Sequence, residues 1–356
     1  MTQPESYSQS FQSPEVHPDG AVTLRLQAPS AKSVDASIAG ITLTLRKDAS
    51  GLWEATTKPL EAGIHDYSFT VDGTRMIDPS NRMVKKWFTL ASMVEIPGQP
   101  PLQTEFQDVP HGIVHRSYYQ STSVGHLRPV VVYTPPGYSE TSDQLYPLLL
   151  LMHGYGDDET AWTEVGRAHL IVDNLIAMGE IQPIIVAMPF GHPVPVKFGE
   201  RPDDYFGTNN EAFEKDLTRD LLPYLESTYR VQHDADGRFI AGLSMGGGHA
   251  IDTGLKNTDT FSAIGAFSAA TPGGSEEELV NEYPSLSGPQ PSANRLKHFW
   301  IPIGTSDFLL DRNDGFTAQL TKLGITHTYK KTDGGHEWKL WRKYLPEFLK
   351  LVVPKS

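Results

Sequence analysis

The first hundred residues alternate apolar and polar positions with a period of two. The apolar positions of the clearest runs are Val22, Leu24 and Leu26, then Val34, Ala36 and Ile38, then Tyr67, Phe69 and Val71. Turn residues separate these runs, and Asp72-Gly73 suits a tight hairpin because glycine tolerates a positive φ. Short strands at this spacing predict a small immunoglobulin-like β-sandwich over residues 21–97. The polar, proline-containing residues 1–20 predict a disordered lead-in.

A different pattern begins after the proline-rich strip Pro97–Pro101, which predicts a stiff linker at residues 98–111. Beyond it, apolar runs of strand length alternate with amphipathic stretches such as Ala168–Met178 and Ala212–Tyr229. The apolar runs are Val130–Tyr133, Leu148–Met152, Ile184–Met188, Phe239–Ala241, Ile264–Phe267 and Phe299–Ile303. Buried strands in alternation with helices predict an α/β domain over residues 112–356, with a mostly parallel sheet covered by helices.

Composition narrows the classes of function. The formal net charge of −13 repels a phosphate backbone, so we expect no nucleic-acid partner. The absence of cysteine excludes disulfides, thiolate nucleophiles and Cys-ligated zinc. No apolar run approaches the roughly 18 residues that span a bilayer, so we expect no membrane partner. The N-terminus has no signal-peptide pattern, which predicts a cytoplasmic protein, or a secreted or periplasmic one if an export signal has been removed.

The segment Gly242-Leu243-Ser244-Met245-Gly246 has the G-x-S-x-G spacing of a nucleophile elbow. The apolar run Phe239–Ala241 enters it, and Gly247–Ala250 begins a helix after it. Such a turn holds its serine in a strained backbone conformation, which is tolerated only where the neighbours lack bulky side chains. This context predicts that Ser244 is a catalytic nucleophile in an α/β-hydrolase fold. The alternative is a glycine-rich turn with an incidental serine.

The partners of such a serine follow it in the order acid, then histidine. His336 lies in a Gly-Gly loop just after the expected strand His327–Thr332, so it is free to turn its imidazole towards Ser244. Asp307 follows the strand Phe299–Ile303 closely and is the preferred acid, which fixes the histidine tautomer and stabilises the imidazolium. Asp311 and Asp314 are rivals, for which the alternative role is to cap a helix over Phe316–Leu323.

Two backbone N–H groups are needed to stabilise the oxyanion of an acyl-transfer intermediate. One is expected at Met245, directly after the nucleophile. The other is expected at Tyr155, because Gly154 and Gly156 let the backbone turn under the reacting carbonyl. His153 reads more readily as a structural residue beneath the elbow. We expect no metal and no cofactor.

Three segments in order, LLLLMHGYGDDETAW, GLSMGGGHA and TDGGHEWKLWRKYL, resemble carbohydrate esterase family 1 from about residue 112 onward. Within that family they are similar to feruloyl and acetylxylan esterases, with enterochelin-esterase-like proteins as neighbours. The resemblance implies a two-step acyl-enzyme mechanism on ester substrates and agrees with the triad of Ser244, Asp307 and His336. The implied substrates are plant cell-wall polysaccharide esters or small phenolic esters.

The front part resembles the carbohydrate-binding module family 48. The residues that carry the resemblance are Ala28-Pro29, Gly51-Leu52-Trp53, Tyr67–Gly73 and Asp78-Pro79-Ser80-Asn81. Trp53 and Trp87 are candidate platforms for a sugar ring, although packing in the core is the commoner fate of such residues. The resemblance therefore leaves glycan binding by this part open.

The leading hypothesis is a feruloyl esterase that releases ferulate from arabinoxylan. The alternatives are an acetylxylan esterase, an esterase of a catecholate trilactone of the enterochelin type, and a carbohydrate-binding protein whose hydrolase domain is inactive. The loop Pro189–Asn210 is rich in aromatic residues that either stack on a phenolic ring or form a packed cover. The candidate substrate contacts are Phe190, Phe198, Tyr205 and Phe206 in this loop, together with Trp162 and Trp338. The oligomeric state stays open.

Overall fold

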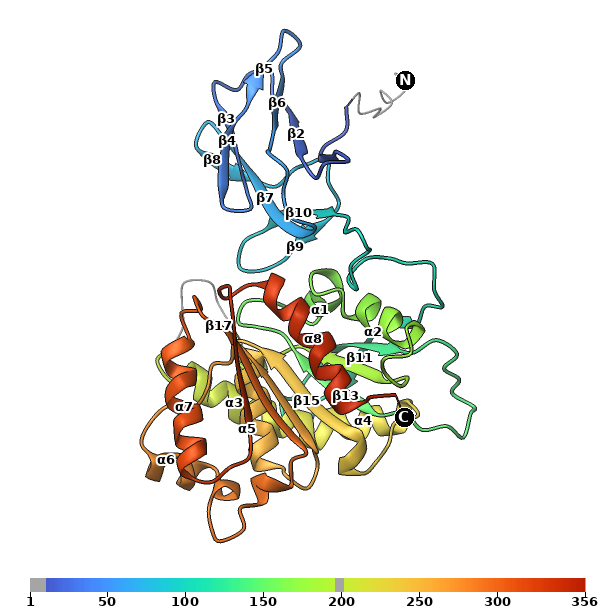
Figure 1. Ribbon diagram of the computed structural model, residues 1–356, viewed down its shortest axis with the longest axis vertical. Helices are drawn as coiled ribbons and strands as arrows, with labels where there is room; N and C mark the ends of the chain where they lie inside the picture. The colour runs from blue at the N-terminus through green and yellow to red at the C-terminus, as the bar shows by residue number, and fades with distance from the viewer. Residues whose placement is uncertain (1–10, 196–201, 356) are drawn as a thin grey trace. The chain divides into compact units, whose positions relative to one another are not determined.

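The structure is a computed structural model that describes residues 11–195 and 202–355. The chain divides into two compact units, residues 1–102 and residues 103–356 (Figure 1). The linker expected at residues 98–111 is therefore shared between the units. Asn174 donates hydrogen bonds to the main-chain oxygens of Gln103 and Glu105, at 2.8 and 3.0 Å, which ties the second half of that segment to the larger unit.

The smaller unit consists of two antiparallel sheets. One has the strand order β1-β2-β6-β5, and the other has the order β4-β3-β7-β10-β9 with β8 paired to β7. The strands are β1 Glu15–Val16, β2 Val22–Gln27, β3 Val34–Ile38, β4 Ile41–Thr44, β5 Arg46–Lys47, β6 Leu52–Thr56, β7 Gly63–Val71, β8 Thr74–Met76, β9 Val84–Lys85 and β10 Ala91–Ile96. Their inward side chains form one core between the sheets, so this unit is a β-sandwich.

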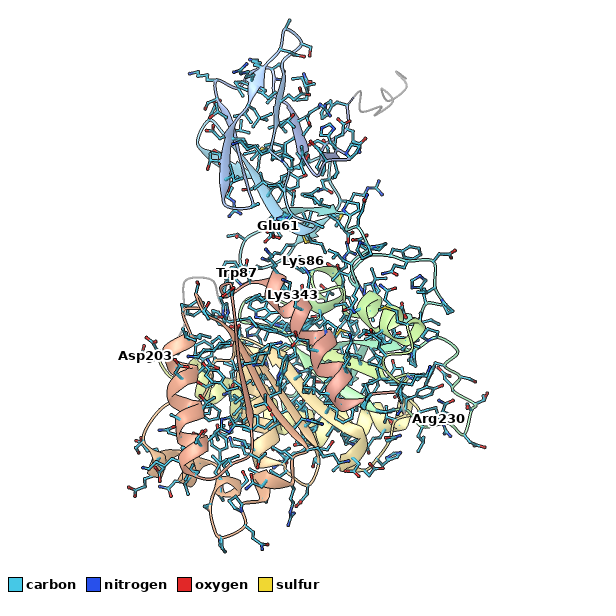
Figure 2. The ribbon with its side chains drawn as sticks, in the orientation of Figure 1. Glu61, Lys86, Trp87, Asp203, Arg230 and Lys343 are labelled. Carbon is cyan, nitrogen blue, oxygen red and sulfur yellow. The ribbon has the colours of Figure 1, made fainter. Side chains whose placement is uncertain are left out.

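Period-two alternation identified the inward faces of β2 and β3 correctly, since the expected apolar residues of both strands are buried. The Asp72-Gly73 hairpin is also present, with φ of 47° and 86° joining β7 to β8. Trp53 belongs to the core, where its indole N–H donates to the oxygen of Ala28 at 2.9 Å, so it is no sugar platform. Trp87, in contrast, is 49% exposed between β9 and β10 (Figure 2).

The expected disorder of residues 1–20 is wrong for residues 11–20. Glu15 and Val16 form β1 and pair with Thr23 and Val22 of β2. This pairing, together with the hydrogen bond that Ser13 donates to the distant Asp78 at 2.7 Å, orders a polar segment whose own sequence carries no ordering signal. Residues 1–10 lie outside the described part of the chain.

The larger unit is built on an eight-stranded sheet with the order β11-β12-β14-β13-β15-β16-β17-β18. The strands are β11 Ile113–Gln120, β12 Leu127–Thr134, β13 Leu148–Met152, β14 Ile185–Pro189, β15 Arg238–Leu243, β16 Ala263–Phe267, β17 His298–Gly304 and β18 Thr328–Thr332. The pairings that involve β11 and β12 are antiparallel, and those from β14 to β18 are parallel. The mostly parallel sheet expected from the apolar runs is confirmed.

Helices connect the strands and cover the sheet (Figure 1). They are α1 Ala161–Glu164, α2 Ala168–Ala177, α3 Tyr205–Asp216, a π-helical turn Leu217–Leu221, α4 Leu222–Thr228, α5 Met245–Lys256, α6 Glu276–Glu282, α7 Leu310–Lys322 and α8 Trp338–Val352. Two start earlier than expected: α3 begins at Tyr205 and α7 at Leu310. In each helix a polar stretch separates these first residues from the amphipathic part that the sequence analysis found. No helix in the described residues is long and apolar enough to cross a bilayer.

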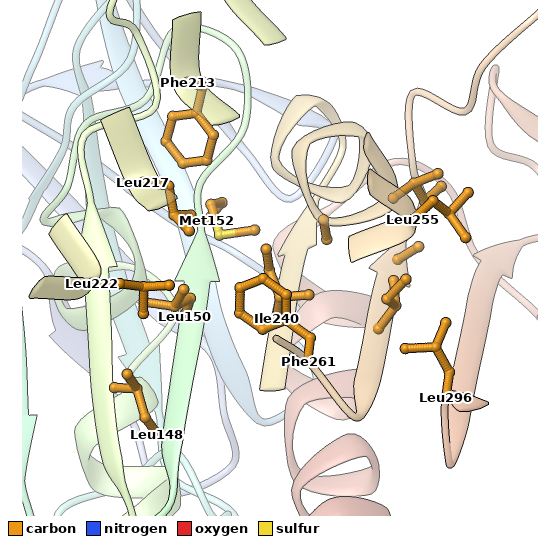
Figure 3. Close-up of a cluster of buried hydrophobic side chains, with 14 of the residues drawn as sticks. Leu148, Leu150, Met152, Phe213, Leu217, Leu222, Ile240, Leu255, Phe261 and Leu296 are labelled. Carbon is orange, nitrogen blue, oxygen red and sulfur yellow. The ribbon is translucent and has the colours of Figure 1, made fainter. Parts of the chain in front are cut away.

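The core of the larger unit shows how an unbroken apolar run builds a sheet buried on both faces. Leu148, Leu150 and Met152 of β13 face α3, α4 and the π-helical turn, where they pack with Phe213, Leu217 and Leu222 (Figure 3). Because side chains alternate along a strand, the intervening leucines of β13 point to the opposite face, and they too are fully buried. This rigid sheet carries the candidate site at the carboxyl ends of its parallel strands.

Candidate active site

Ser244 occupies the turn between β15 and α5, with φ of 54° and ψ of −116°. A non-glycine residue rarely adopts such a conformation, and the surrounding structure must hold it there. The N–H of Ser244 donates to the oxygen of Phe267 at 2.9 Å, and its own oxygen accepts from Gly248 at 3.1 Å and from Ala270 at 2.9 Å. These bonds pin the strained turn to the end of the neighbouring strand β16.

The glycines that flank Ser244 are required by close backbone approach. A Cβ at Gly242 would lie 2.4 Å from the oxygen of Gly246, and one at Gly246 would lie 2.5 Å from the oxygen of His153. No real side chain fits at these distances. The packing of β15, α5 and the end of β13 therefore leaves no room for side chains at these two glycines, as the sequence analysis expected for a nucleophile elbow.

His336 and Asp307 form a hydrogen-bonded pair. Nδ1 of His336 lies 2.9 Å from Oδ2 and 3.1 Å from Oδ1 of Asp307. The Asp307 side chain is fully buried, whereas that of His336 retains 17% exposure. Burial by itself raises the pKa of the Asp307 carboxyl, but hydrogen bonds from His336 and from the N–H of Leu309 outweigh it and hold the pKa below its ordinary value. Asp307 is thus an ionised acceptor for the imidazole.

Asp311 and Asp314, the alternative candidates for the acid of the triad, do not contact His336 within the described residues and lie in α7. Asp314 lies within α7, pairs with Lys331 at 2.7 Å and accepts from the hydroxyl of Tyr329 at 2.6 Å. Asp311 lies in the exposed first turn of α7. Neither caps a helix that begins at Phe316, as the sequence had suggested, because α7 already starts at Leu310.

The order of the strands brings these residues to one edge. Ser244 follows β15, Asp307 follows β17 and His336 follows β18, and the strands from β15 to β18 are adjacent and parallel. Parallel strands end at the same edge of their sheet, which is where ligands bind in α/β folds. The loop after β13 lies on the opposite side of Ser244, because β13 and β16 flank β15. It comes close to the serine, since a Cβ at Gly154 would lie 3.5 Å from the Cβ of Ser244.

His153 fixes the shape of that loop. Its Nδ1–H donates to the oxygen of Gly154 at 2.8 Å, and its Nε2 accepts from the N–H of Gly191 at 2.8 Å. Burial lowers the pKa of His153 to about 4, so the ring is neutral and this tautomer is set by its two partners. The structural role expected for His153 agrees with these contacts. Tyr155 and Gly156 follow it, with Gly156 at φ of 88°.

Aromatic side chains line the same side of Ser244. Tyr155 contacts Tyr205 and Phe206 edge to face, with ring centroids 5.7 and 5.5 Å apart, and Phe190 lies against His153 at 5.7 Å. Tyr155, Phe190 and Phe206 keep partly exposed surface, whereas Tyr205 is buried. Of the aromatic residues expected to contact substrate, Phe190 and Phe206 are thus available to it, whereas the expectation for Tyr205 is wrong because its ring is buried. Phe198 lies outside the described residues.

Trp162 and Trp338 are not available in this way, which corrects the expectation that they contact substrate. Trp162 is 1% exposed and donates its indole N–H to the oxygen of Met152 at 2.9 Å. Trp338 is also buried and packs edge to face on Trp162, with centroids 5.1 Å apart. Both tryptophans belong to the packing between α1 and α8.

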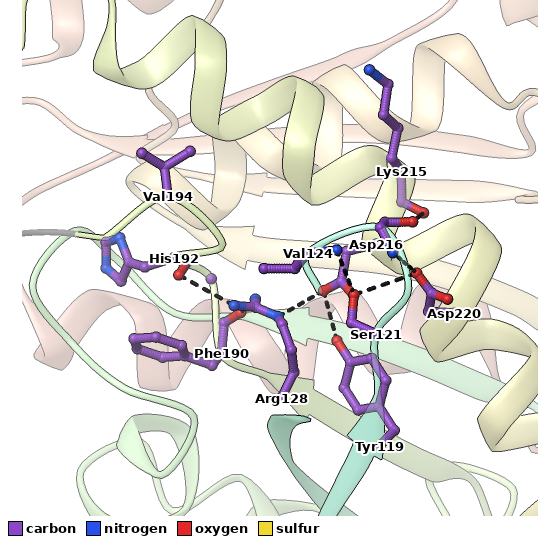
Figure 4. A network of polar contacts seen from close by, with 12 residues as sticks. Tyr119, Ser121, Val124, Arg128, Phe190, His192, Val194, Lys215, Asp216 and Asp220 are labelled. Atoms are coloured by element: carbon purple, nitrogen blue, oxygen red, sulfur yellow. Dashed lines mark hydrogen bonds and ion pairs between the residues drawn. The ribbon is translucent and has the colours of Figure 1, made fainter. Parts of the chain in front are cut away.

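A buried ion pair that the sequence analysis missed supports the aromatic side (Figure 4). Arg128 of β12 is 1% exposed and donates through Nε to Oδ2 of Asp216 at 2.9 Å. Its remaining N–H groups donate to the main-chain oxygens of His192, at 3.2 Å, and Phe190. Tyr119 adds a hydroxyl bond to Asp216 at 2.7 Å. An arginine inside an apolar strand was the available signal, since a buried charge must be paired.

Polar contacts also fasten the start of α3 to the site. The hydroxyl of Tyr205 lies 2.6 Å from Nδ1 of His192, and Asn209 donates to the oxygen of Gly191 at 3.0 Å. Asn209 also lies 3.1 Å from Nε2 of His249, which is fully buried in α5. Within the described residues no group of histidine and carboxylate side chains is arranged to hold a metal ion.

Comparison with known proteins agrees with this geometry. The Esterase family profile matches residues 121–351. The endo-1,4-beta-xylanase/feruloyl esterase of Xylanibacter ruminicola is 36% identical over 268 residues, which cover 72% of this chain and 36% of that protein. This chain thus spans about a third of the length of that relative.

Solved structures give the same picture. A ferulic acid esterase aligns with a TM-score of 0.58 at 26% identity, over 68% of this chain and 98% of its own. The enterobactin esterase FES of Shigella flexneri aligns with a TM-score of 0.69 at 20% identity, over 98% of each chain. The expected likeness to feruloyl and enterochelin-type esterases is confirmed.

The family profile begins at residue 121, so the resemblance of the smaller unit to a carbohydrate-binding module stays a prediction. For the larger unit, the strand order, the strained serine turn and the sequence match coincide. The chain therefore belongs to the Esterase family and has an α/β-hydrolase fold.

Proposed function

We propose that this protein is a serine carboxylic ester hydrolase that acts on plant cell-wall esters and releases ferulate from arabinoxylan. The observation that carries the proposal is the His336–Asp307 pair, which stands at the same sheet edge as the strained Ser244. A buried carboxylate held ionised against a partly exposed imidazole matches the support that a serine nucleophile needs.

In the first half of the reaction, His336 accepts the proton of the Ser244 hydroxyl as its Oγ attacks the ester carbonyl. Asp307 accepts the Nδ1–H of His336, so Nε2 is the nitrogen that takes the proton. We assign the oxyanion to the N–H groups of Met245 and Tyr155, which belong to the two segments that meet at Ser244. The imidazolium then protonates the departing alcohol oxygen, and an acyl-enzyme ester remains on Ser244.

In the second half, a water molecule replaces the alcohol. His336 takes a proton from that water as it attacks the acyl carbonyl, and returns the proton to Oγ of Ser244 when the acid leaves. All bonds made and broken are those of ester hydrolysis, and the proposal requires no cofactor.

Ferulate is favoured over acetate by the aromatic lining. Tyr155, Phe190 and Phe206 present partly exposed rings on the side of Ser244 that carries the proposed oxyanion groups. An aromatic acyl group can pack against such rings, whereas an acetyl group is too small to use them. The relative named as a xylanase/feruloyl esterase supports the same choice.

For the smaller unit we propose a module related to carbohydrate-binding modules. The support is its two-sheet core and the buried Asp78, whose carboxylate accepts from Ser13 at 2.7 Å and from the hydroxyl of Tyr67 at 2.8 Å. These bonds give the Asp-Pro-Ser-Asn segment a structural role, in which the loop is held to β7 and to the N-terminal segment.

The function is tested by initial rates on methyl ferulate, acetylated xylan and a catecholate trilactone, measured side by side for the wild-type protein and Ser244→Ala. We expect methyl ferulate to be the best of the three, and Ser244→Ala to lose about 10³-fold or more of its turnover. Ser262→Ala is the matched control. Ser262 is a buried serine that lies just before β16, at the end of the sheet away from the carboxyl ends of the parallel strands. Retention of a tenth of the wild-type rate in Ser244→Ala would refute the assignment of Ser244 as the nucleophile. A clear preference for acetylated xylan or the catecholate trilactone would refute the assignment of ferulate esters as the substrate.

A further inference from the structure

One aromatic residue at the site is strongly exposed. Phe308 is 77% exposed, and its ring centroid lies 4.5 Å from that of His336. The imidazole also contacts the ring of Trp341 edge to face, with centroids 5.0 Å apart, and Trp341 is buried. His336 therefore contacts one tryptophan of the core and one phenylalanine that is open to solvent.

The backbone holds Phe308 in a fixed position. The N–H of Leu309 donates to Oδ1 of Asp307 at 2.9 Å, and the N–H of Leu310 donates to the oxygen of Asp307 at 3.0 Å. Phe308 lies at the centre of this short turn, between the end of β17 and the start of α7. The same carboxylate that orients His336 thus also orders the turn that carries the exposed ring.

The strand order indicates which part of an ester would meet this ring. The loop after β13 lies on one side of Ser244, and β17 and β18, with Asp307 and His336, lie on the other. The imidazolium must reach the oxygen of the departing alcohol to protonate it. A side chain that packs on His336 consequently borders the alcohol part of the ester, while the rings of Tyr155 and Phe206 border the acyl side.

We propose that Phe308 is a specificity-determining contact for the alcohol part of the substrate, and that it stacks against the sugar ring whose hydroxyl carries the acyl group. The C–H face of a sugar is apolar and covers an exposed aromatic ring, which lowers the apolar area in contact with water. This inference rests on the proposed ester hydrolase function and adds the leaving-group subsite to it.

The test compares two ferulate esters that differ only in the alcohol, namely a ferulate ester of arabinose and methyl ferulate. Wild type, Phe308→Ala and Phe308→Tyr are measured for kcat and KM on both. Loss of one stacking contact corresponds to about a fivefold change. We expect Phe308→Ala to lower the preference for the sugar ester over the methyl ester by about fivefold, mainly through KM, and Phe308→Tyr to restore it.

Phe106 provides a matched control. It is 75% exposed and stacks on His111 with centroids 4.5 Å apart, so Phe106→Ala removes an equally exposed ring from a histidine that is not part of the site. The Phe106→Ala variant should show the same preference for the sugar ester over the methyl ester as the wild type. A Phe308→Ala variant with unchanged preference overturns the proposal. Equal losses on both esters also overturn it, since they would mean that the ring acts on the acyl group or only positions His336.

The outcome stays separate from the choice of acyl group. If the wild-type protein hydrolyses neither ferulate ester, the proposed ferulate specificity fails, and the same ratio is then measured with acetyl esters of the same two alcohols. A fivefold loss of preference for the sugar acetate in Phe308→Ala supports the leaving-group subsite, and an unchanged ratio refutes it.

Discussion

Removal of the buried Arg128 side chain tests how far the ion pair behind the site supports the fold. In Arg128→Met the carboxylate of Asp216 loses its cation at 2.9 Å, and the main-chain oxygens of Phe190 and His192 lose their donors. The side chains of Arg128 and Asp216 are each 1% exposed, so water does not replace these partners without a rearrangement. The methionine retains most of the volume, which limits the effect to the lost polar contacts.

The expected cost is large for a single substitution. Breaking a buried ion pair from one side costs about 3–5 kcal/mol, because the remaining charge is left desolvated and unpaired. For a domain of this size, that range corresponds to a fall in Tm of about 10 °C. Arg116→Met is the control. Arg116 of β11, the strand next to β12, is 63% exposed and pairs with Glu164 of α1 at 2.6 Å, and an exposed pair contributes only about 0–1 kcal/mol.

The assay is urea unfolding followed by tryptophan fluorescence, with calorimetry to separate the transitions of the two units. Asp216→Asn and the double variant Arg128→Met/Asp216→Asn complete a cycle. We expect the double variant to be more stable than the sum of the single effects predicts, by about 2 kcal/mol, because neither charge is then left unpaired. An Arg128→Met variant within about 1 kcal/mol of wild type, with no coupling in the cycle, would show that the pair is solvated and that the reasoning is wrong.

Three further predictions concern the site. Asp307→Asn should lower kcat on methyl ferulate by about 10³–10⁴-fold, because it removes the carboxylate that lies 2.9 Å from His336. Asp311→Asn should change kcat less than about threefold. If a kinetic comparison gave the reverse order, Asp311 would be the acid of the triad. Gly246→Ala should abolish activity and lower Tm, since its Cβ would lie 2.5 Å from the oxygen of His153. Gly315 of α7 has open space around it, so Gly315→Ala should raise the free energy of unfolding by up to about 1 kcal/mol in urea unfolding. Burial lowers the pKa of His153 to about 4 and that of His192 to about 3, so below pH 6.5 these histidines bind protons in the unfolded chain but not in the folded one. The free energy of unfolding should therefore fall as the pH drops from 6.5 towards 4, by about 1.4 kcal/mol per pH unit for each histidine. A flat profile in urea titrations over this pH range would contradict the buried neutral state.

Local patterns in the sequence were sufficient to predict the buried strands of the larger unit and to select the residues of the proposed triad. Leu148–Met152 is continuous and apolar because β13 is buried on both faces, and its observed bounds equal the expected ones. Gly242 and Gly246 stand two positions before and after Ser244 because the backbone approaches too closely there to leave room for a Cβ. The positions of Asp307 and His336, just after the last two strands, follow from where parallel strands end. Each of these inferences uses a constraint that acts within a few residues.

The remaining features depend on contacts between distant segments, which periodicity does not record. Arg128 meets Asp216 across 88 positions of the chain, and His336 meets Asp307 across 29. Burial separated the aromatic residues that the sequence analysis treated alike, since Trp162 belongs to the core while Phe206 keeps partly exposed surface. An aromatic side chain carries the same apolar area in either place. The tertiary structure alone decides whether other side chains or solvent cover it, and therefore whether a substrate can reach it.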